Sequence, residues 1–151
     1  AGFDLTLVKA DGARMRGIKA PRADEPMIVP GSATVIHVVS ADVIGRPLDD
    51  DTVHRLSELC ALLGAEPGES ITAAHLGRLI SHPKGGASGS EGLRRIALIN
   101  QVDDAKTAAL ARVAAETAMA GQSPPQGVVL ASMLADAPIV DIVETAVTKA
   151  D

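Results

Sequence analysis

Three short runs of β-branched and aliphatic residues recur along the chain, with helical patterns between them, and this alternation limits the folds open to the sequence. The runs are residues 33–40, 95–100 and 128–132. Each is nearly continuous in apolar residues, as is typical of parallel strands that are covered on both faces. Helices between such strands provide the crossover connections that a parallel sheet needs. We therefore predict an α/β fold, with a mainly parallel sheet and helices on both faces.

One further strand is predicted near the start of the chain. Residues 3–9 form a short, largely apolar run that ends at the turn residues Asp11 and Gly12. The last segment, residues 138–151, fits either a strand followed by a peripheral tail or a helix, and the pattern leaves both alternatives open.

Helices are predicted where apolar residues fall three or four positions apart. One covers residues 53–63 and stops at Gly64, and a second follows an N-cap at Thr72. The third, residues 104–120, is rich in alanine and ends before Gly121. Its predicted inner face consists of Leu110, Val113 and Thr117.

Composition bounds the class of protein. The 151 residues suffice for one globular domain that buries roughly 68–70% of its unfolded surface. The net charge of −5 argues against nucleic-acid binding, and Phe3, the only aromatic residue, cannot build a platform for stacked bases. No apolar run reaches the roughly 18 residues of a membrane helix, and no signal peptide is visible. We expect a cytoplasmic protein with no nucleic-acid or membrane partner.

Polar residues follow each predicted strand, at the sheet edge where open α/β folds bind ligands. Turns favour the same residue types, so each position also fits an ordinary turn. The positions are Asp11 and Gly12, Asp42, Asn100 and Asp103, and Ser132.

Two of these positions resemble nucleotide-binding elements. A carboxylate placed after a strand, as Asp11 is, holds Mg²⁺ in P-loop NTPases. Asn100 and Asp103 resemble the Asn-Lys-x-Asp element of GTPases, in which the Asp binds guanine, although Gln101 stands in place of the Lys. The alternative is that Asn100 ends a strand and that Asp103 caps the next helix.

Other candidates indicate structure more than chemistry. The glycine-rich stretch from Gly86 to Gly92 precedes a strand, so it does not open a helix as a phosphate-binding loop would. His37 lies within an apolar strand, and Cys60 lies on the apolar face of its helix. We expect both side chains to be buried in the core.

Longer motifs resemble those of one family. Residues 10–21 (ADGARMRGIKAP) and 24–28 (DEPMI) resemble the most specific block of the YqeC family, accessory proteins of selenium-dependent molybdenum hydroxylases. Lys9 stands where the family usually has Glu before this block. Further matches follow in the same order, at Gly45-Arg46-Pro47-Leu48, Val53-His54-Arg55, Gly68-Glu69-x-Ile71-Thr72, His82-Pro83-Lys84-Gly85-Gly86 and Leu98-Ile99-Asn100-Gln101-Val102-Asp103.

The resemblance implies a P-loop NTPase-like fold in which a Gly-x-Gly-Lys-Thr loop comes well before residue 10. Residues 1–151 are then expected to form a single α/β domain, the C-terminal part of a longer nucleotide-binding protein. By position, Asp11 would hold Mg²⁺, and nucleotide contacts would involve Gly12, Asn100, Asp103 and Ser132. The polar residues to which no role is assigned are Arg14, Lys19, Glu25, Asp42 and His54.

The implied function is maturation of a selenium-dependent molybdenum hydroxylase, with GTP or ATP bound together with Mg²⁺ in the intact protein. Residues 1–151 contain no Gly-x-x-x-x-Gly-Lys-Ser/Thr, so we expect no nucleotide turnover from them alone. The alternative is a non-catalytic scaffold module with a vestigial nucleotide site, which Lys9 and Gln101 favour. The expected partners are hydroxylase or cofactor-maturation proteins, and a homo-oligomer stays open.

Overall fold

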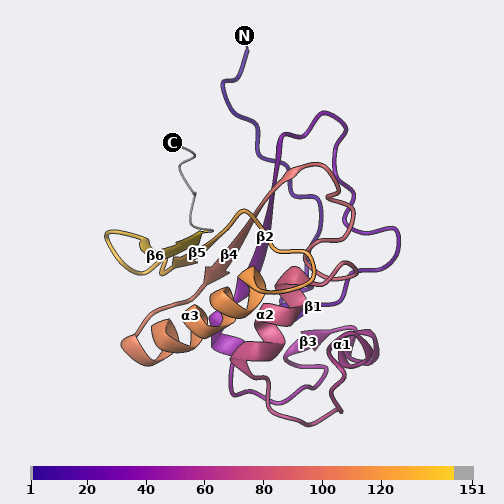
Figure 1. Cartoon of the computed structure of the whole chain (residues 1–151), viewed down its shortest axis with the longest axis vertical. Helices are drawn as coiled ribbons and strands as arrows, with labels where there is room; N and C mark the ends of the chain where they lie inside the picture. The colour runs from indigo at the N-terminus through magenta and orange to yellow at the C-terminus, as the bar shows by residue number, and fades with distance from the viewer. Residues whose placement is uncertain (1, 145–151) are drawn as a thin grey trace, which may run out of the picture.

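A four-stranded, mostly parallel sheet forms the centre of the molecule (Figure 1). The computed structural model describes residues 2–144. The sheet order is β2-β4-β5-β6, in which β2 (Thr34–Ser40), β4 (Arg94–Asn100) and β5 (Gly127–Ala131) are parallel. The predicted α/β fold with a mainly parallel sheet is thereby confirmed, and the three apolar runs are its three parallel strands.

The end of the described chain adds an antiparallel strand at the sheet edge. Strand β6 (Ile139–Glu144) pairs with β5, with a register shift next to Leu130. Of the two alternatives for residues 138–151, a strand is therefore correct for this part. Residues 145–151 lie outside the described residues.

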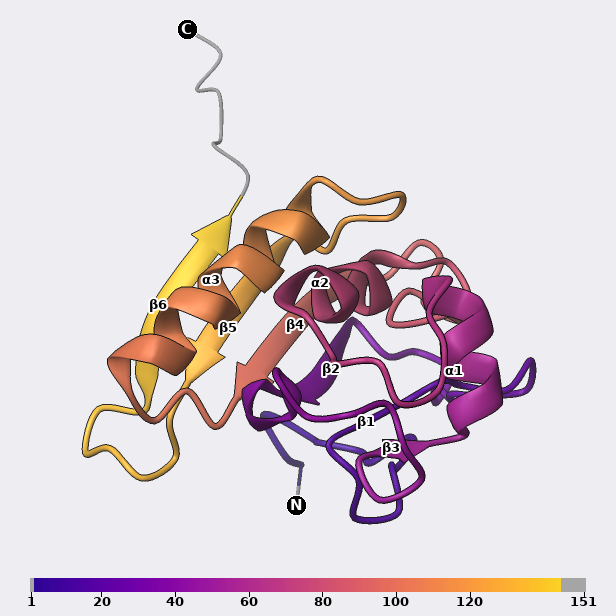
Figure 2. The same ribbon diagram turned by 90° about the horizontal axis from the view of Figure 1, so that it is seen from below.

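Two helices pack against each other on one face of the sheet, as Figure 2 shows. They are α2 (Ala73–Ser81) and α3 (Ala105–Met119), and the shorter α1 (Leu56–Leu63) lies beside α2. The pair approach closely at Gly77, where an added Cβ would lie 2.5 Å from the carbonyl oxygen of Ala114. None of the three is both long and apolar enough to cross a membrane.

The inner face of α3 differs from the prediction. Small side chains are buried there, and Val113 is 49% exposed, so the prediction is wrong for Val113, whereas Leu110 and Thr117 are half-buried. The backbone of α3 lies close to α2 at Gly77, so the contact there is made by small side chains and by Thr117. The buried residues are Ala111, Ala114, Ala115 and Ala118.

The sheet is covered by α2 and α3 on one face only. Val39, Ile99 and Leu130 are buried beneath the helices, whereas Ile36 and Val38 on the opposite face are 52% and 56% exposed. The prediction of helices on both faces thus holds for one face within residues 2–144.

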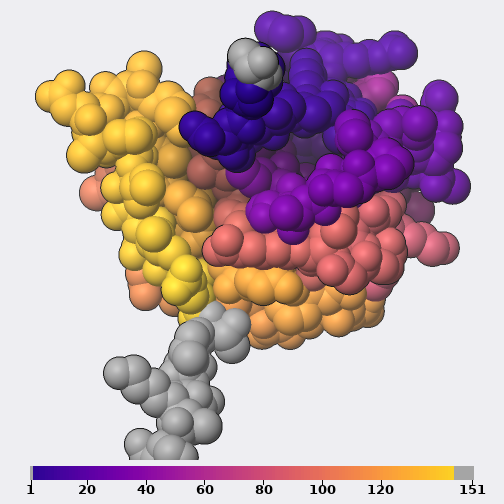
Figure 3. Space-filling view, turned by 90° about the horizontal axis from the view of Figure 1, so that it is seen from above, coloured from indigo at the N-terminus to yellow at the C-terminus, as the bar shows by residue number. Residues whose placement is uncertain are grey.

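The predicted strand at residues 3–9 is wrong. Residues 2–17 form no strand, and Leu7 is 80% exposed. Figure 3 shows the start of the chain, in indigo, on the outside of the molecule. A strand needs a hydrogen-bonded neighbour, and this segment makes no ladder with β2.

Helix boundaries follow from local pairing and capping. The predicted helix at 53–63 begins only at Leu56, because β3 (Val53–His54) pairs in parallel with β1 (Ile18–Lys19). Thr72 caps α2 as predicted, and its Oγ1 accepts a hydrogen bond from the His75 amide at 3.1 Å.

Candidate functional site

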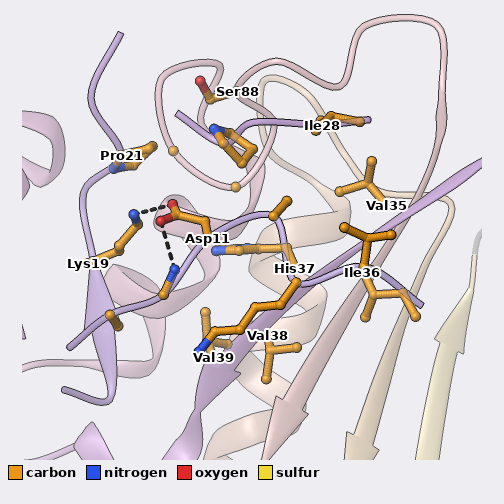
Figure 4. A pocket seen from close by; sticks show the side chains of 18 of the residues that line it. Asp11, Lys19, Pro21, Ile28, Val35, Ile36, His37, Val38, Val39 and Ser88 are labelled. Atoms are coloured by element: carbon orange, nitrogen blue, oxygen red, sulfur yellow. Dashed lines mark hydrogen bonds and ion pairs between the residues drawn. The ribbon is translucent and has the colours of Figure 1, made fainter. Parts of the chain in front are cut away.

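A cavity of about 360 Å³ lies along the outer edge of β2 (Figure 4). Its second wall is the segment 8–13, and apolar side chains such as Ile28 and Val35 form much of the lining. The polar side chains that reach it include Asp11, Lys19 and His37. Its volume and its mixture of apolar walls with a few polar groups are typical of a small-molecule site.

A partly buried cluster of charges lies at one end of this cavity. The ammonium of Lys19 contacts the Asp11 carboxylate and lies 2.8 Å from Glu25 Oε2. Arg55 holds the same glutamate with both terminal nitrogens, at 2.5 Å to Oε2 and 2.7 Å to Oε1. Hydrogen bonds from Arg55 and then Lys19 hold the pKa of Glu25 far below its ordinary value.

The backbone around the cluster positions its members. Lys19 lies on β1 and pairs with His54 on β3, and Arg55 immediately follows β3. Arg55 has φ of 67°, in the left-handed region, and its Nη1 also donates to the Ala20 carbonyl at 3.0 Å. The β1–β3 pair therefore brings residues 19 and 55 onto the same glutamate.

His37 joins β2 to this cavity. Its ring is buried, and burial lowers its pKa to about 4, so the imidazole is neutral at pH 7. Its Nδ1 has no hydrogen-bond partner among the described residues. Gly86 packs against the ring with no room for a side chain. His37 was expected in the core, but as a whole residue it is only half-buried, and it lines the cavity.

A second polar group lies at the carboxyl ends of the parallel strands. Ser132 donates from Oγ to Asp103 Oδ1 at 2.6 Å, so the structure brings two predicted site residues together. Asn100 ends β4, and its Oδ1 is buried without a partner among the described residues. The next residue, Gln101, has φ of 62° and hydrogen bonds to the Ser40 side chain at the end of β2.

The two polar groups are separate features of the structure. Asp11, Gly12 and Lys19 line the cavity, whereas Asn100, Asp103 and Ser132 do not. Asp104, rather than Asp103, caps α3, accepting from the Thr107 amide at 2.7 Å.

The remaining predicted residues take different positions. Asp42 forms an exposed ion pair with Arg46, outside the cavity. Arg14 is exposed with φ of 50°, and His54 lies on β3, where burial lowers its pKa. Glu25 is the centre of the charged cluster.

Sequence reasoning missed the importance of Arg55. It stands in the motif Val53-His54-Arg55, of which only His54 is predicted to be a site residue. No local sequence pattern marks Arg55 as a site residue, because its partner Glu25 is 30 positions away in the chain. The pairing of β1 with β3 places Lys19 beside Arg55, and both side chains bind Glu25.

The protein is an α/β protein whose mostly parallel sheet has a ligand-sized cavity at its edge. Comparison with known proteins identifies its family. Residues 1–57 match the family model described as YqeC protein. A relative from Escherichia coli (strain K12), described as uncharacterized protein YqeC, is 32% identical over 106 residues. The chain belongs to the YqeC family.

The alignment covers 70% of this chain but 41% of the relative, so the chain spans about two fifths of that relative's length. No solved structure shows significant similarity to the chain. The resemblance read from the motifs is therefore confirmed at the level of the family.

Proposed function

We propose that this protein is an accessory protein for the maturation of a selenium-dependent molybdenum hydroxylase and that it binds GTP or ATP. The observation that carries the proposal is the cavity at the edge of the parallel sheet, in which Asp11 and Lys19 meet. A carboxylate and an ammonium group side by side provide the two charges that a magnesium–phosphate group needs.

Lys19 is the candidate phosphate ligand. Its side chain is only 12% exposed and already lies between the two carboxylates of Asp11 and Glu25. A bound phosphate would offer the ammonium a third anionic partner and would release Asp11 for a cation. Arg55 would keep Glu25 neutralised during this exchange, because it binds that glutamate through both terminal nitrogens.

The described residues fit a Mg²⁺ ion that arrives with a nucleotide, but they do not form a resident metal site. Within residues 2–144 no three His, Cys, Asp or Glu side chains are grouped as metal ligands. Asp11 would supply one ligand, and phosphate oxygens and water would supply the others.

Calorimetric titration with Mg-GTP and Mg-ATP tests nucleotide binding. We expect binding to the intact protein, and we expect Asp11→Asn to weaken it by about tenfold or more, since a charged ligand is lost. Asp4→Asn is the matched control, because Asp4 is an exposed carboxylate of the same segment outside the cavity lining. Absence of binding, or equal affinities of the two variants, contradicts the proposal.

Asp103→Ala tests the base-side assignment separately. If Asp103 selects guanine, the variant loses its preference for Mg-GTP over Mg-ATP and keeps its affinity for inorganic triphosphate. If the hydrogen bond from Ser132 is its only role, the nucleotide preference does not change.

A scaffold function is the second candidate, and the contact between Lys19 and Asp11 favours it. A carboxylate that is already neutralised within the chain is a poor ligand for a cation. Capture of a molybdenum hydroxylase component by the immobilised protein, with equal yield in the presence and absence of Mg-GTP, would support this function.

A further inference from the structure

Both carboxylate oxygens of Asp11 have a partner within the chain. Oδ2 contacts the ammonium of Lys19, as Figure 4 shows, and Oδ1 accepts a hydrogen bond from the Gly12 amide at 2.7 Å. An ammonium in contact with a carboxylate stands where a metal ion would have to bind, and its charge repels that ion. A free cation therefore reaches Asp11 only if Lys19 moves away.

Glu25 gives Lys19 a second partner that does not depend on Asp11. Its Oε2 lies 2.8 Å from the ammonium and also accepts from the Arg22 amide at 3.2 Å. Arg55 binds both oxygens of the same glutamate and so holds its carboxylate in place. Because an ammonium has three donors, Lys19 can leave Asp11 and keep its contact with Glu25. The contact with Asp11 is therefore the exchangeable one.

Only part of the charged cluster faces the cavity. Asp11 and Lys19 line the cavity, whereas Glu25 and Arg55 do not. A ligand in the cavity therefore meets the ammonium without touching the pair formed by Glu25 and Arg55. An anion is attracted by that ammonium. A free cation instead meets two carboxylates that are already balanced by two basic side chains.

We propose that Lys19 controls the access of metal ions to Asp11: it excludes a free divalent cation, and it releases the carboxylate when a phosphate group in the cavity binds the ammonium. The phosphate then replaces Asp11 as one anionic partner of Lys19, while Glu25 remains the other. The released Asp11 oxygen becomes available to a metal ion that the phosphate carries. The inference rests on the proposed function, since it takes Asp11 as the metal ligand of the bound nucleotide.

Titration with Mn²⁺ alone tests the exclusion. Electron paramagnetic resonance measures the free Mn²⁺ in a buffer without phosphate or nucleotide. We expect Lys19→Gln to bind Mn²⁺ about tenfold more tightly than the parent or better, because a positive charge is removed from direct contact with the carboxylate. The double variant Lys19→Gln/Asp11→Asn should lose this gain, which would locate the ion at Asp11.

Lys9→Gln is the matched control. Lys9 also lines the cavity, but within residues 2–144 it forms no ion pair with Asp11 or Glu25. Since a more distant charge is screened by water and salt, we expect this variant to gain about twofold in Mn²⁺ affinity or less. Circular dichroism checks that all variants are folded.

Three results of the Mn²⁺ titrations overturn the proposal. An unchanged affinity in Lys19→Gln would show that Lys19 excludes no cation. An equal gain in Lys9→Gln would show an effect of overall charge rather than of the contact with Asp11. A gain that persists in the double variant would place the ion elsewhere.

The parent protein tests the release without any change to Lys19. NMR follows the ¹³C signal of the Asp11 carboxyl carbon, which is identified by its absence in Asp11→Asn. We expect Mg²⁺ alone to leave this signal in place and Mg²⁺ with inorganic triphosphate to shift it. A shift with Mg²⁺ alone, or no shift with both, overturns the proposal even if Lys19→Gln does not fold.

These outcomes separate the role of Lys19 from the proposed function. If Mg-GTP or Mg-ATP binds, but the parent and Lys19→Gln take up free Mn²⁺ equally, nucleotide binding stands and the control by Lys19 is wrong. If Lys19→Gln gains Mn²⁺ at Asp11, but neither nucleotide nor triphosphate binds, the proposed function is wrong. In that case Lys19 only neutralises Asp11, and the proposed release by phosphate is wrong as well.

Discussion

Lys19 contacts the carboxylate of Asp11, so the carboxylate proposed for magnesium is neutralised from within the chain. The same ammonium group lies 2.8 Å from Glu25 Oε2 and thereby links two segments of the cavity wall. The contact with Glu25 gives Lys19 a structural role whether or not a nucleotide binds.

Replacement of Lys19 should destabilise the fold. In Lys19→Gln, two partly buried carboxylates lose their shared cation, and we expect a loss of about 1–3 kcal/mol in the free energy of unfolding. Urea denaturation measures the change. Lys106→Gln is the control, since Lys106 is exposed on α3. If both variants lie within about 0.5 kcal/mol of the parent, the cluster does not stabilise the fold.

Glu25 should make the fold sensitive to acid. Its pKa is lowered in the folded state from an ordinary value of 4.5, so the unfolded chain binds the proton first. The stabilisation by its ion pairs is therefore complete above pH 4.5 and is lost as the pH falls below that value. We expect Glu25→Gln to be less stable at pH 7 and to lose less stability between pH 5 and 3.

Urea midpoints across this pH range give the measurement for Glu25. The control is Glu58→Gln, because Glu58 is exposed in the first turn of α1. A pH profile for Glu25→Gln that parallels that of the control would contradict the prediction.

His37 should add a second pH dependence, at higher pH. Burial lowers its pKa from 6.5 to about 4, and unfolding releases the ring to its ordinary value. The unfolded state therefore binds more protons between these values, and folding loses stability as the pH falls from 6.5 towards 4, by about 3 kcal/mol over the whole range.

The ring protons of His37, followed by NMR, should titrate near pH 4. In His37→Leu, the dependence of stability on pH between 6.5 and 4 should become shallower. A ring that titrates near 6.5 in the folded protein would show that His37 is accessible to water.

Gly77 should be intolerant of substitution. Alanine ordinarily favours a helix over glycine by about 1 kcal/mol, but at this position its Cβ would lie 2.5 Å from both the Ala114 carbonyl oxygen and Thr117 Cβ. The clash should outweigh the helical preference, and we expect Gly77→Ala to cost about 1–3 kcal/mol. Thermal unfolding, with Gly2→Ala as the control in open space, measures the difference.

Local patterns predicted much of the fold. The β-branched runs became β2, β4 and β5, and the cap at Thr72 began α2, because these features depend on neighbours in the sequence. Residues 3–9 have an equally good strand pattern and form no strand, because pairing depends on a distant edge that no local pattern describes.

The candidate site was predicted only in part. The motifs predict Asp11, Lys19 and Glu25 as site residues, and the structure joins them in one cluster. Their link to Arg55 depends on the β1–β3 pairing of two strands of two residues each, which are too short to leave a periodic signal.

The sequence by itself determined the α/β class, the three parallel strands and the family, since hydrophobic periodicity and motif order are properties of neighbouring residues. Only the tertiary structure decided which carboxylate Lys19 neutralises, that small side chains form the inner face of α3, and that β2 lies at the edge of the sheet. These depend on the distance between segments far apart in the chain, which is set by packing and by strand register.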